Sequence, residues 1–466
     1  METIYSKYIY NCEIENIEVY FEYNNSVIYS TQEKPIVNNG LGRKICKELV
    51  VISSVEVENY EGVFETNRYF RKDNLVIQGI ISFFTGVPLT VYHSNSSSAG
   101  LRPIEYAQQE VHLSVEGKDY TNDLLVLLNR LEEEPDFIIS LLDRWRKAIY
   151  LKAESCDADL YYDESILSFF HILELFGESE NKALKDKLEK NIEDILGQYF
   201  SNYYLSKNQI EQMVNQNKKA IGKILMGDYL TLSIKVKHFL EKYQLLDDNV
   251  AFFVDKMIEK RNAIAHGRIT CQKKFIWPLS PFFNLAKDSY ENIEFLFFLT
   301  AEMIDKYIGI KCWEDEWNQA RCFLMPSKLT MESFLNGEIN LQNDALDALS
   351  NGNEYHITWR TLFNYYVKNP KNAIKEKIES TVKDVFLKTD VDEENAPDVF
   401  NISLILADSI QTDIQQKAVD NIKLIIKNRW YGWSNFKDAY SYLDFYSVKV
   451  EWYKGFLDKK EYLQCK

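Results

Sequence analysis

The spacing of apolar residues changes near residue 121, and this change limits the possible folds more than any other feature of the sequence. Before it, Ile17, Val19, Phe21 and Tyr23 occupy alternate positions, as expected for a half-buried strand. After it, apolar residues recur three or four positions apart, as on one face of a helix: Phe137, Leu141, Trp145, Ala148 and Ile149. A strand-rich segment followed by a helical one predicts an α+β protein.

Residues 1–125 are predicted to form a β-rich N-terminal domain. Short runs rich in β-branched and aromatic residues, with Asn24-Asn25-Ser26 as a turn between the first two, predict the strands. The predicted strands are 17–23, 27–29, 49–57, 75–77 and 89–92. The serine-rich segment Ser94–Gly100 is predicted to be a flexible loop between them and the helical part of the chain.

The rest of the chain is predicted to be helical. Asp163 is the predicted N-cap of the second helix, and Pro326-Ser327 is a candidate boundary. We therefore expect a helical domain over 126–325 and a helical C-terminal region over 326–466. The predicted helices of the middle domain are 136–153, 166–176, 182–203, 207–225, 231–243, 249–266 and 284–308.

Composition excludes several classes of protein. The chain has 466 residues, 46% of them hydrophobic and 27% charged, which indicates a folded protein of two or three domains. A net charge of −16 argues against a general nucleic-acid coat, so any contact with RNA must use a local basic patch. The most apolar helical stretch, Ile293–Ile310, contains four charged residues and is predicted to be a core helix rather than a membrane span.

Cysteine usage and the N-terminus point to the cytoplasm. Seven cysteines are scattered without a C-x-x-C pair or zinc-ligand spacing, which favours free thiols, a reducing compartment and no bound metal. The first residues lack the apolar segment of a signal peptide. Phosphate-binding loops and serine-hydrolase motifs are absent from the sequence, so no cofactor is expected.

The segment Lys260–Gly267 brings chemically useful side chains to the end of a predicted helix. Asn262 and His266 are four residues apart and share a helix face, and the long side chain of Arg261 can reach the same point. Gly267 follows as a natural helix terminator. Histidine moves protons near neutral pH, and arginine stabilises the charge that develops on a phosphate. The combination is therefore suited to cleaving RNA through its 2′-hydroxyl.

A local basic patch surrounds this segment, so the segment could contact RNA although the chain as a whole is acidic. Its members, predicted to bind RNA, are Lys256, Lys260, Arg268, Lys273 and Lys274. A purely structural interpretation exists, because histidine and basic residues in the last helical turn often serve only as favourable caps.

Two other stretches allow two interpretations each. The region of His238, with Lys235, Lys237 and Lys242, could extend an RNA path or form a solvated helix face. The run Lys427–Phe436 interleaves basic and aromatic residues, as in surfaces that stack single-stranded nucleic acid. The alternative for this run is a corner between helices with Trp430 and Trp433 in the core.

Arg261, Asn262 and His266 match the R-N-x(3)-H form of the RxxxxH motif, and in this respect the chain resembles HEPN ribonucleases, which are helical bundles. The helix around Trp145 and the segment Ser165–Phe176 are similar to the two opening helices of ApeA-type HEPN proteins. The resemblance covers roughly residues 1–310. It implies that Glu174, the motif glutamate, belongs to the site and could pair with Arg261. The alternative is a charge on the helix face without a role in the site.

The resemblance also implies an activity and partners. We expect a metal-independent endoribonuclease acting in abortive infection against phage, on tRNA or another structured RNA. HEPN domains usually pair two motifs across a symmetric interface, so a homodimer or larger homo-oligomer is expected, with a phage-derived trigger protein and no membrane. The alternatives are a non-catalytic HEPN scaffold within a defence or toxin–antitoxin complex, and ligand sensing by the N-terminal domain without cleavage.

Overall fold

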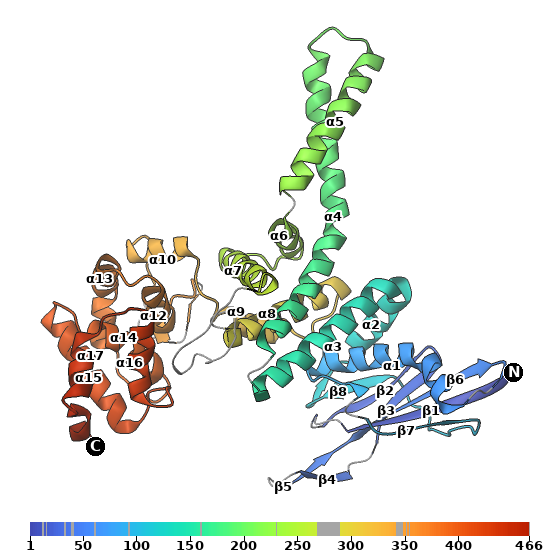
Figure 1. Cartoon of the computed structure of the whole chain (residues 1–466), viewed down its shortest axis with the longest axis horizontal. Coiled ribbons are helices and arrows are strands. Elements are labelled where there is room, and N and C mark those ends of the chain that lie inside the picture. Colours follow the sequence, from blue (N-terminus) through green and yellow to red (C-terminus); the bar gives the residue numbers. More distant parts are fainter. Residues whose placement is uncertain are drawn as a thin grey trace. The chain divides into compact units, whose positions relative to one another are not determined.

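A computed structural model describes residues 1–466 except 12–13, 15, 32–33, 39–41, 60–61, 92–93, 159–160, 230, 268–288, 342–347, 351, 354 and 466. The described residues form an antiparallel sheet followed by helices, which confirms the predicted α+β class (Figure 1). The chain divides into two compact units, 1–245 with 289–317, and 246–288 with 318–466. The three predicted domains, 1–125, 126–325 and 326–466, stay a prediction.

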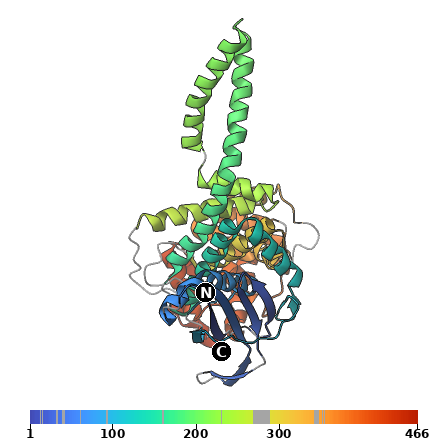
Figure 2. The ribbon, with the colours of Figure 1, turned by 90° about the vertical axis from the view of Figure 1, so that its right-hand side faces the viewer.

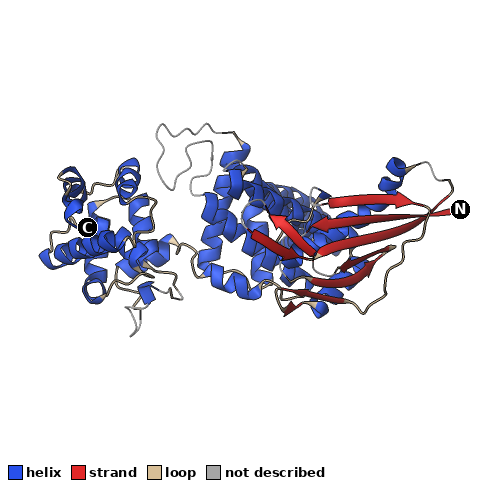
Figure 3. Ribbon diagram, turned by 90° about the horizontal axis from the view of Figure 1, so that it is seen from below, coloured by secondary structure: helices blue, strands red, loops and turns tan. Residues whose placement is uncertain are grey.

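The main sheet of the first unit has the strand order β7-β1-β6-β3-β2-β8-β9, and Figure 3 shows its strands side by side. The longest pair is β1 with β6, antiparallel from Glu2 opposite Val57 to Asn11 opposite Glu48. The strands are β1 (Glu2–Asn11), β2 (Glu18–Tyr23), β3 (Ser26–Ser30), β6 (Glu48–Val57), β7 (Ser94–Gly100), β8 (His112–Val115) and β9 (Lys118–Asp119). A separate hairpin joins β4 (Lys34–Asn38) to β5 (Gly42–Cys46).

Two predictions for this region were wrong. Leu75-Val76-Ile77, predicted as a strand, lies in the helix α1 (Val63–Thr85), which packs against β1, β3, β6 and β7. Short apolar runs fit a buried helix as well as a strand, and only length separates them. Ser94–Gly100, predicted as a flexible loop, is strand β7, because β1 supplies its backbone partners. Leu89 and Thr90, predicted to begin a strand, have no regular structure.

Trp145 lies at the centre of the helical part of the first unit. It is fully buried on α3 (Pro135–Ala158), with Phe83 of α1 at 5.7 Å and Phe169 of α4 at 6.1 Å between ring centroids. Its indole N–H donates to the Ser82 carbonyl at 3.2 Å. The remaining helices of this unit are α2 (Thr121–Glu133), α4 (Tyr162–Ser201), α5 (Lys207–Tyr229), α6 (Leu232–Lys242) and α8 (Ser289–Ile308). The apolar spacing that predicted α3 therefore marks the core.

Helix α4 is longer than predicted. It runs without a break for 40 residues, where the sequence suggested two helices over 166–176 and 182–203, and Tyr161 rather than Asp163 is its N-cap. Its second half pairs with α5, and the two helices extend together away from the sheet (Figure 2). None of the described helices is long and apolar enough to cross a membrane.

The second unit has its own helical core, in which Trp359, Phe400 and Tyr453 are buried. Helix α7 (Asp248–Ala265) belongs to this unit by its contacts, although it precedes the other helices by more than 60 residues. The other elements are α10 (Lys328–Leu335), α12 (Trp359–Lys368), α13 (Asn372–Lys388), α14 (Ala396–Leu406), α15 (Thr412–Asn428), α16 (Phe436–Phe445), α17 (Glu451–Asp458) and η2 (Glu461–Cys465). Helix α9 (Glu314–Arg321) spans the division between the units.

Candidate functional site

Helix α7 carries the Arg261–His266 motif, and its first turn is fixed by side-chain contacts. Asp247 is the N-cap, and its carboxylate accepts hydrogen bonds from the backbone N–H groups of Asn249 and Val250, both at 2.8 Å. The other carboxylate oxygen accepts from Arg321 at 2.5 Å. The Asn249 side-chain oxygen accepts the backbone N–H of Ser327 at 3.0 Å. The start of α7 is thus bonded to residues 321–327.

Phe253, Met257 and Ile264 form the buried face of α7, as the sequence predicted. The motif side chains occupy other positions around the helix. Arg261 is half-buried, whereas Asn262 and His266 are exposed. A helix that buries one stripe leaves its other positions to solvent, and the motif takes those positions.

The end of α7 has the geometry that the glycine predicted. His266 is the C-cap, and its backbone N–H donates to the Asn262 carbonyl at 3.1 Å. Gly267 follows with a φ of +59°, the left-handed region where a Cβ atom is costly. Its N–H donates to the Ile264 carbonyl at 2.9 Å, so the helix ends at His266.

Arg261 and Asn262 are in direct contact. The guanidinium Nη1 donates a hydrogen bond to the Asn262 Oδ1 at 3.2 Å. An amide that accepts through its oxygen still has two N–H protons to donate. The pair therefore combines a cation with a donor group at the exposed end of the helix, one turn from His266.

Of the predicted basic patch, the structure describes Lys256 and Lys260. Lys256 is exposed, pairs with Glu259 at 3.2 Å and lies 5.5 Å from the centre of the Phe252 ring. Lys260 is half-buried next to the motif. Arg268, Lys273 and Lys274 lie outside the described residues. The patch is therefore described only on α7 itself.

Glu174 and Arg261 belong to different units. Glu174 is half-buried on α4 in the first unit, and Arg261 is on α7 in the second. The pairing of these side chains therefore stays a prediction.

The stretch around His238 does not form a free basic surface. Glu180 on α4 is buried, and its carboxylate contacts His238 Nδ1 at 3.1 Å and Lys242 Nζ at 2.7 Å. Lys235 pairs with Glu178 at 2.7 Å. These contacts join α6 to α4, while Lys242 remains exposed, and the two interpretations of the stretch stay predictions.

The tryptophans of the Lys427–Phe436 run pack inward, as the corner interpretation predicted. Trp430 and Trp433 are half-buried against the core of the second unit, and the Trp433 indole N–H donates to Asn401 Oδ1 at 2.8 Å. The neighbouring Tyr431 and Phe436 pack against the same core and also line a cavity.

Two features of the site were not predicted from the sequence. Asp247 was not identified, although an Asp before an amphipathic run is a helix-start signal that could have revealed it. Arg321, its partner, is 74 positions away, and no local pattern indicates that contact. Among the described residues, no group of three or more His, Cys, Asp or Glu side chains is placed to hold a metal ion.

Comparisons with known proteins provide no relative. No family model, no curated protein and no solved structure matches the chain.

Proposed function

We propose that this chain is a metal-independent endoribonuclease of the HEPN type, with Arg261, Asn262 and His266 as its catalytic residues. The observation that supports the proposal is the arrangement at the end of α7. A cation bonded to an amide and an exposed imidazole lie within one helical turn, next to a glycine terminus. A helix can be capped without these three side chains, so capping alone does not account for their combination.

The proposed reaction follows from the chemistry of these groups. A base removes the proton of the ribose 2′-hydroxyl, and the 2′-oxygen attacks the adjacent phosphorus. The bond from phosphorus to the 5′-oxygen breaks, and that oxygen takes a proton. The products are a 2′,3′-cyclic phosphate and a 5′-hydroxyl. His266 moves the protons, Arg261 stabilises the charged phosphate, and Asn262 orients either the imidazole or the phosphate.

A single set of these residues offers one imidazole, whereas the reaction needs both a base and an acid. Two chains related by a two-fold axis would supply both, together with two arginines. The proposed active form is therefore a homodimer with both α7 helix ends at one cleft. Glu174 would hold Arg261 in place within this site.

The proposed biological role is abortive infection, in which cleavage of cellular or phage RNA stops growth. An enzyme of this kind must be silent until infection, since unregulated cleavage would kill the host. The β-rich region 1–125 is the proposed sensor of a phage-derived trigger. The competing function is a non-catalytic scaffold, which the following experiment distinguishes.

The test compares wild-type protein with His266→Asn on total RNA in EDTA, with and without lysate from phage-infected cells. Asparagine keeps a polar cap at the helix end but cannot transfer protons, so cleavage should fall about 100-fold or more. His112→Asn is the matched control, because it makes the same substitution on strand β8, outside the motif and the basic patch. Mass spectrometry of the products should find 2′,3′-cyclic phosphate ends.

Two results would contradict the proposal. Equal cleavage by wild type and His266→Asn would remove His266 from the chemistry. No cleavage by either protein, even with infected lysate, would favour the scaffold.

A further inference from the structure

A cavity of about 570 Å³ lies in the second unit, where the end of α15 turns toward α16. Its walls come from three segments: the last residues of α15, the turn 430–435 with the first residue of α16, and η2. The lining side chains that matter here are Lys427, Arg429, Tyr431, Asn435, Phe436 and Tyr462. Small-molecule sites in proteins typically have a volume of this order.

One wall of the cavity is aromatic. Phe436 lies 5.7 Å from Tyr431 and 5.2 Å from Tyr462 between ring centroids. All three rings are half-buried, so each is held by its neighbours while part of its surface remains accessible. The Tyr453 hydroxyl donates a hydrogen bond to the Phe436 carbonyl at 2.7 Å and so helps to hold the backbone at Phe436 in place. The Phe436 ring is inclined by 73° to the Tyr431 ring and by 58° to the Tyr462 ring, so a flat, unpaired base can stack on one ring while a neighbouring ring contacts its edge.

The charged side chains in the described lining are basic. Lys427 and Arg429 are exposed at the cavity, and the described residues that line it include no Asp or Glu, in a chain whose net charge is −16. Lys437, one residue after Phe436, lies 4.9 Å from the centre of the Tyr462 ring. Asp438 and Glu461 are the acidic neighbours in sequence. The cavity thus offers phosphate-binding groups beside a stacking surface.

Arg429 occupies a position that normally favours glycine. It is the C-cap of α15, and its φ of +61° and ψ of 35° are left-handed. A non-glycine residue is costly there, and Gly or Asn usually fills it. Eight other described non-glycine residues also have a positive φ, so the conformation by itself assigns no use to the guanidinium. It does mean that glycine is compatible with the backbone at this position.

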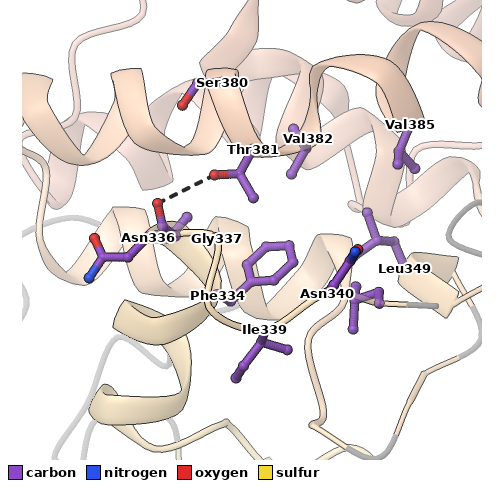
Figure 4. A pocket seen from close by; sticks show the side chains of 12 residues that line it. Phe334, Asn336, Gly337, Ile339, Asn340, Leu349, Ser380, Thr381, Val382 and Val385 are labelled. Atoms are coloured by element: carbon purple, nitrogen blue, oxygen red, sulfur yellow. Dashed lines mark hydrogen bonds between the residues drawn. The ribbon is translucent and has the colours of Figure 1, made fainter.

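A second cavity in this unit shows the contrast. It encloses about 480 Å³ between α10 and α13, with Phe334 on one side and Thr381 and Val382 on the other (Figure 4). Among the described residues that line it, none is charged, and the Thr381 hydroxyl donates to the Leu335 carbonyl at 3.5 Å. The described lining of this cavity therefore lacks the basic groups that line the cavity at Arg429.

We propose that the cavity at Arg429 binds an unpaired nucleotide, with its base against Tyr431, Phe436 and Tyr462 and its phosphate on Lys427 and Arg429. The same chemistry suits a free nucleotide and a nucleotide within single-stranded RNA. The choice of RNA rests on the proposed function, since a nuclease needs contacts that hold its substrate away from the scissile bond. In that role the C-terminal region would capture RNA for the α7 site.

The test measures binding with the full-length His266→Asn protein in EDTA, so that no RNA is cut. A fluorescent single-stranded 12-mer RNA is titrated by anisotropy, and AMP is tested alone and as a competitor. Arg429→Gly is the principal variant, because glycine suits the left-handed backbone and the fold should be retained. Arg429→Lys and Tyr431→Leu separate charge from stacking. Lys388→Ala on α13 and Tyr365→Leu on α12 are matched controls.

Tyr431→Leu should weaken RNA binding roughly 5- to 150-fold, the range for losing one stacked base. Arg429→Gly should weaken it roughly 10- to 150-fold, the range for losing a hydrogen bond between charged groups. Arg429→Lys should restore part of the affinity, and both controls should bind like the parent. Unchanged binding by Arg429→Gly, or no binding of the 12-mer by the parent, would overturn the proposal. Tight binding of AMP without binding of RNA would assign the cavity to a free nucleotide instead.

The two proposals can fail separately. If wild-type protein cuts RNA and Arg429→Gly binds RNA normally, the cavity proposal is wrong and the nuclease stands. If no cleavage is found but RNA binding depends on Arg429, the nuclease proposal is wrong and the cavity proposal stands.

Discussion

At the residue scale, the two ends of helix α7 differ in their contacts. Asp247 at the start of α7 is a structural anchor, with three hydrogen bonds to Asn249, Val250 and Arg321. The exposed end carries Asn262 and His266. Because a helix behaves as a rigid rod over 18 residues, contacts at Asp247 help to orient the motif at the opposite end.

We expect Asp247→Ala to lower the free energy of unfolding by about 1–2 kcal/mol, because the cap and the Arg321 contact are both lost. Asp247→Asn should cost less, since an asparagine side chain also caps a helix. Chemical denaturation of both variants measures the difference. Equal losses would mean that the cap contributes little and the ion pair dominates. The ion pair is partly exposed, with Asp247 at 31% and Arg321 at 33%, and this argues against that result.

At the scale of elements, the pair formed by α4 and α5 differs from the rest of the first unit. Helix α3 packs against α1, α2, α4 and α8, whereas the main contact of α5 is α4. Among the described side chains of α5, Val214 is buried and most others are exposed. Lys218 pairs with Glu193 at 2.8 Å, but exposed pairs of this kind contribute little. Few apolar side chains of α5 are therefore buried against α4.

We expect the backbone amides of α5 to exchange with solvent faster than those of α3, because local opening is easiest where few apolar contacts are broken. Hydrogen–deuterium exchange followed by mass spectrometry measures this directly. Val214→Ala should increase exchange in α5 further and leave α3 unchanged. Equal protection of the two helices would show that something else covers α5 in solution.

At the scale of the whole molecule, acidic groups gather inside the first unit. Glu302 and Asp305 are buried on α8, and one oxygen of each lacks a hydrogen-bond partner. Burial raises the pKa of Asp305 to about 8, and the nearby carboxylates of Glu302 and Asp123 act in the same direction. The backbone N–H of Trp313 and the ammonium of Lys306 oppose this increase. Burial also raises the pKa of Glu302.

The sign of the effect on stability follows from the direction of the pKa shift. Between about pH 4 and pH 8 the folded state keeps the Asp305 proton and the unfolded state has lost it, so this group favours unfolding increasingly as the pH rises. The contribution is constant below about pH 4 and again above about pH 8. The slope is at most about 1.4 kcal/mol per pH unit.

We expect Asp305→Asn to stabilise the protein more at pH 8 than at pH 5, because asparagine stays neutral at both values. The amide oxygen can still accept the Trp313 N–H, so the local bond is retained. Urea denaturation of both proteins at pH 5, 6.5 and 8 gives the comparison. An identical difference at all three values would contradict the shifted pKa.

The sequence by itself determined the local features of this protein. Alternating residues predicted β2, a run of β-branched residues predicted β6, and helical spacing predicted α3, α6 and α7 with nearly the observed bounds. The left-handed conformation of Gly267 and the buried face of α7 also followed, because both depend on residues within a few turns. The proposal of Arg261, Asn262 and His266 as catalytic residues also rests on local spacing, and it stays a proposal.

Only the tertiary structure decided what depends on distant partners. Ser94–Gly100 is a strand because β1 lies beside it, and 75–77 is helical because α1 covers the sheet. The contact of Asp247 with Arg321, the burial of Asp305, and the cavity that joins Arg429 to Tyr462 all arise between segments far apart in the chain. Residue spacing reports the neighbours along a helix or strand, and it contains no information on which surfaces the packed chain brings together.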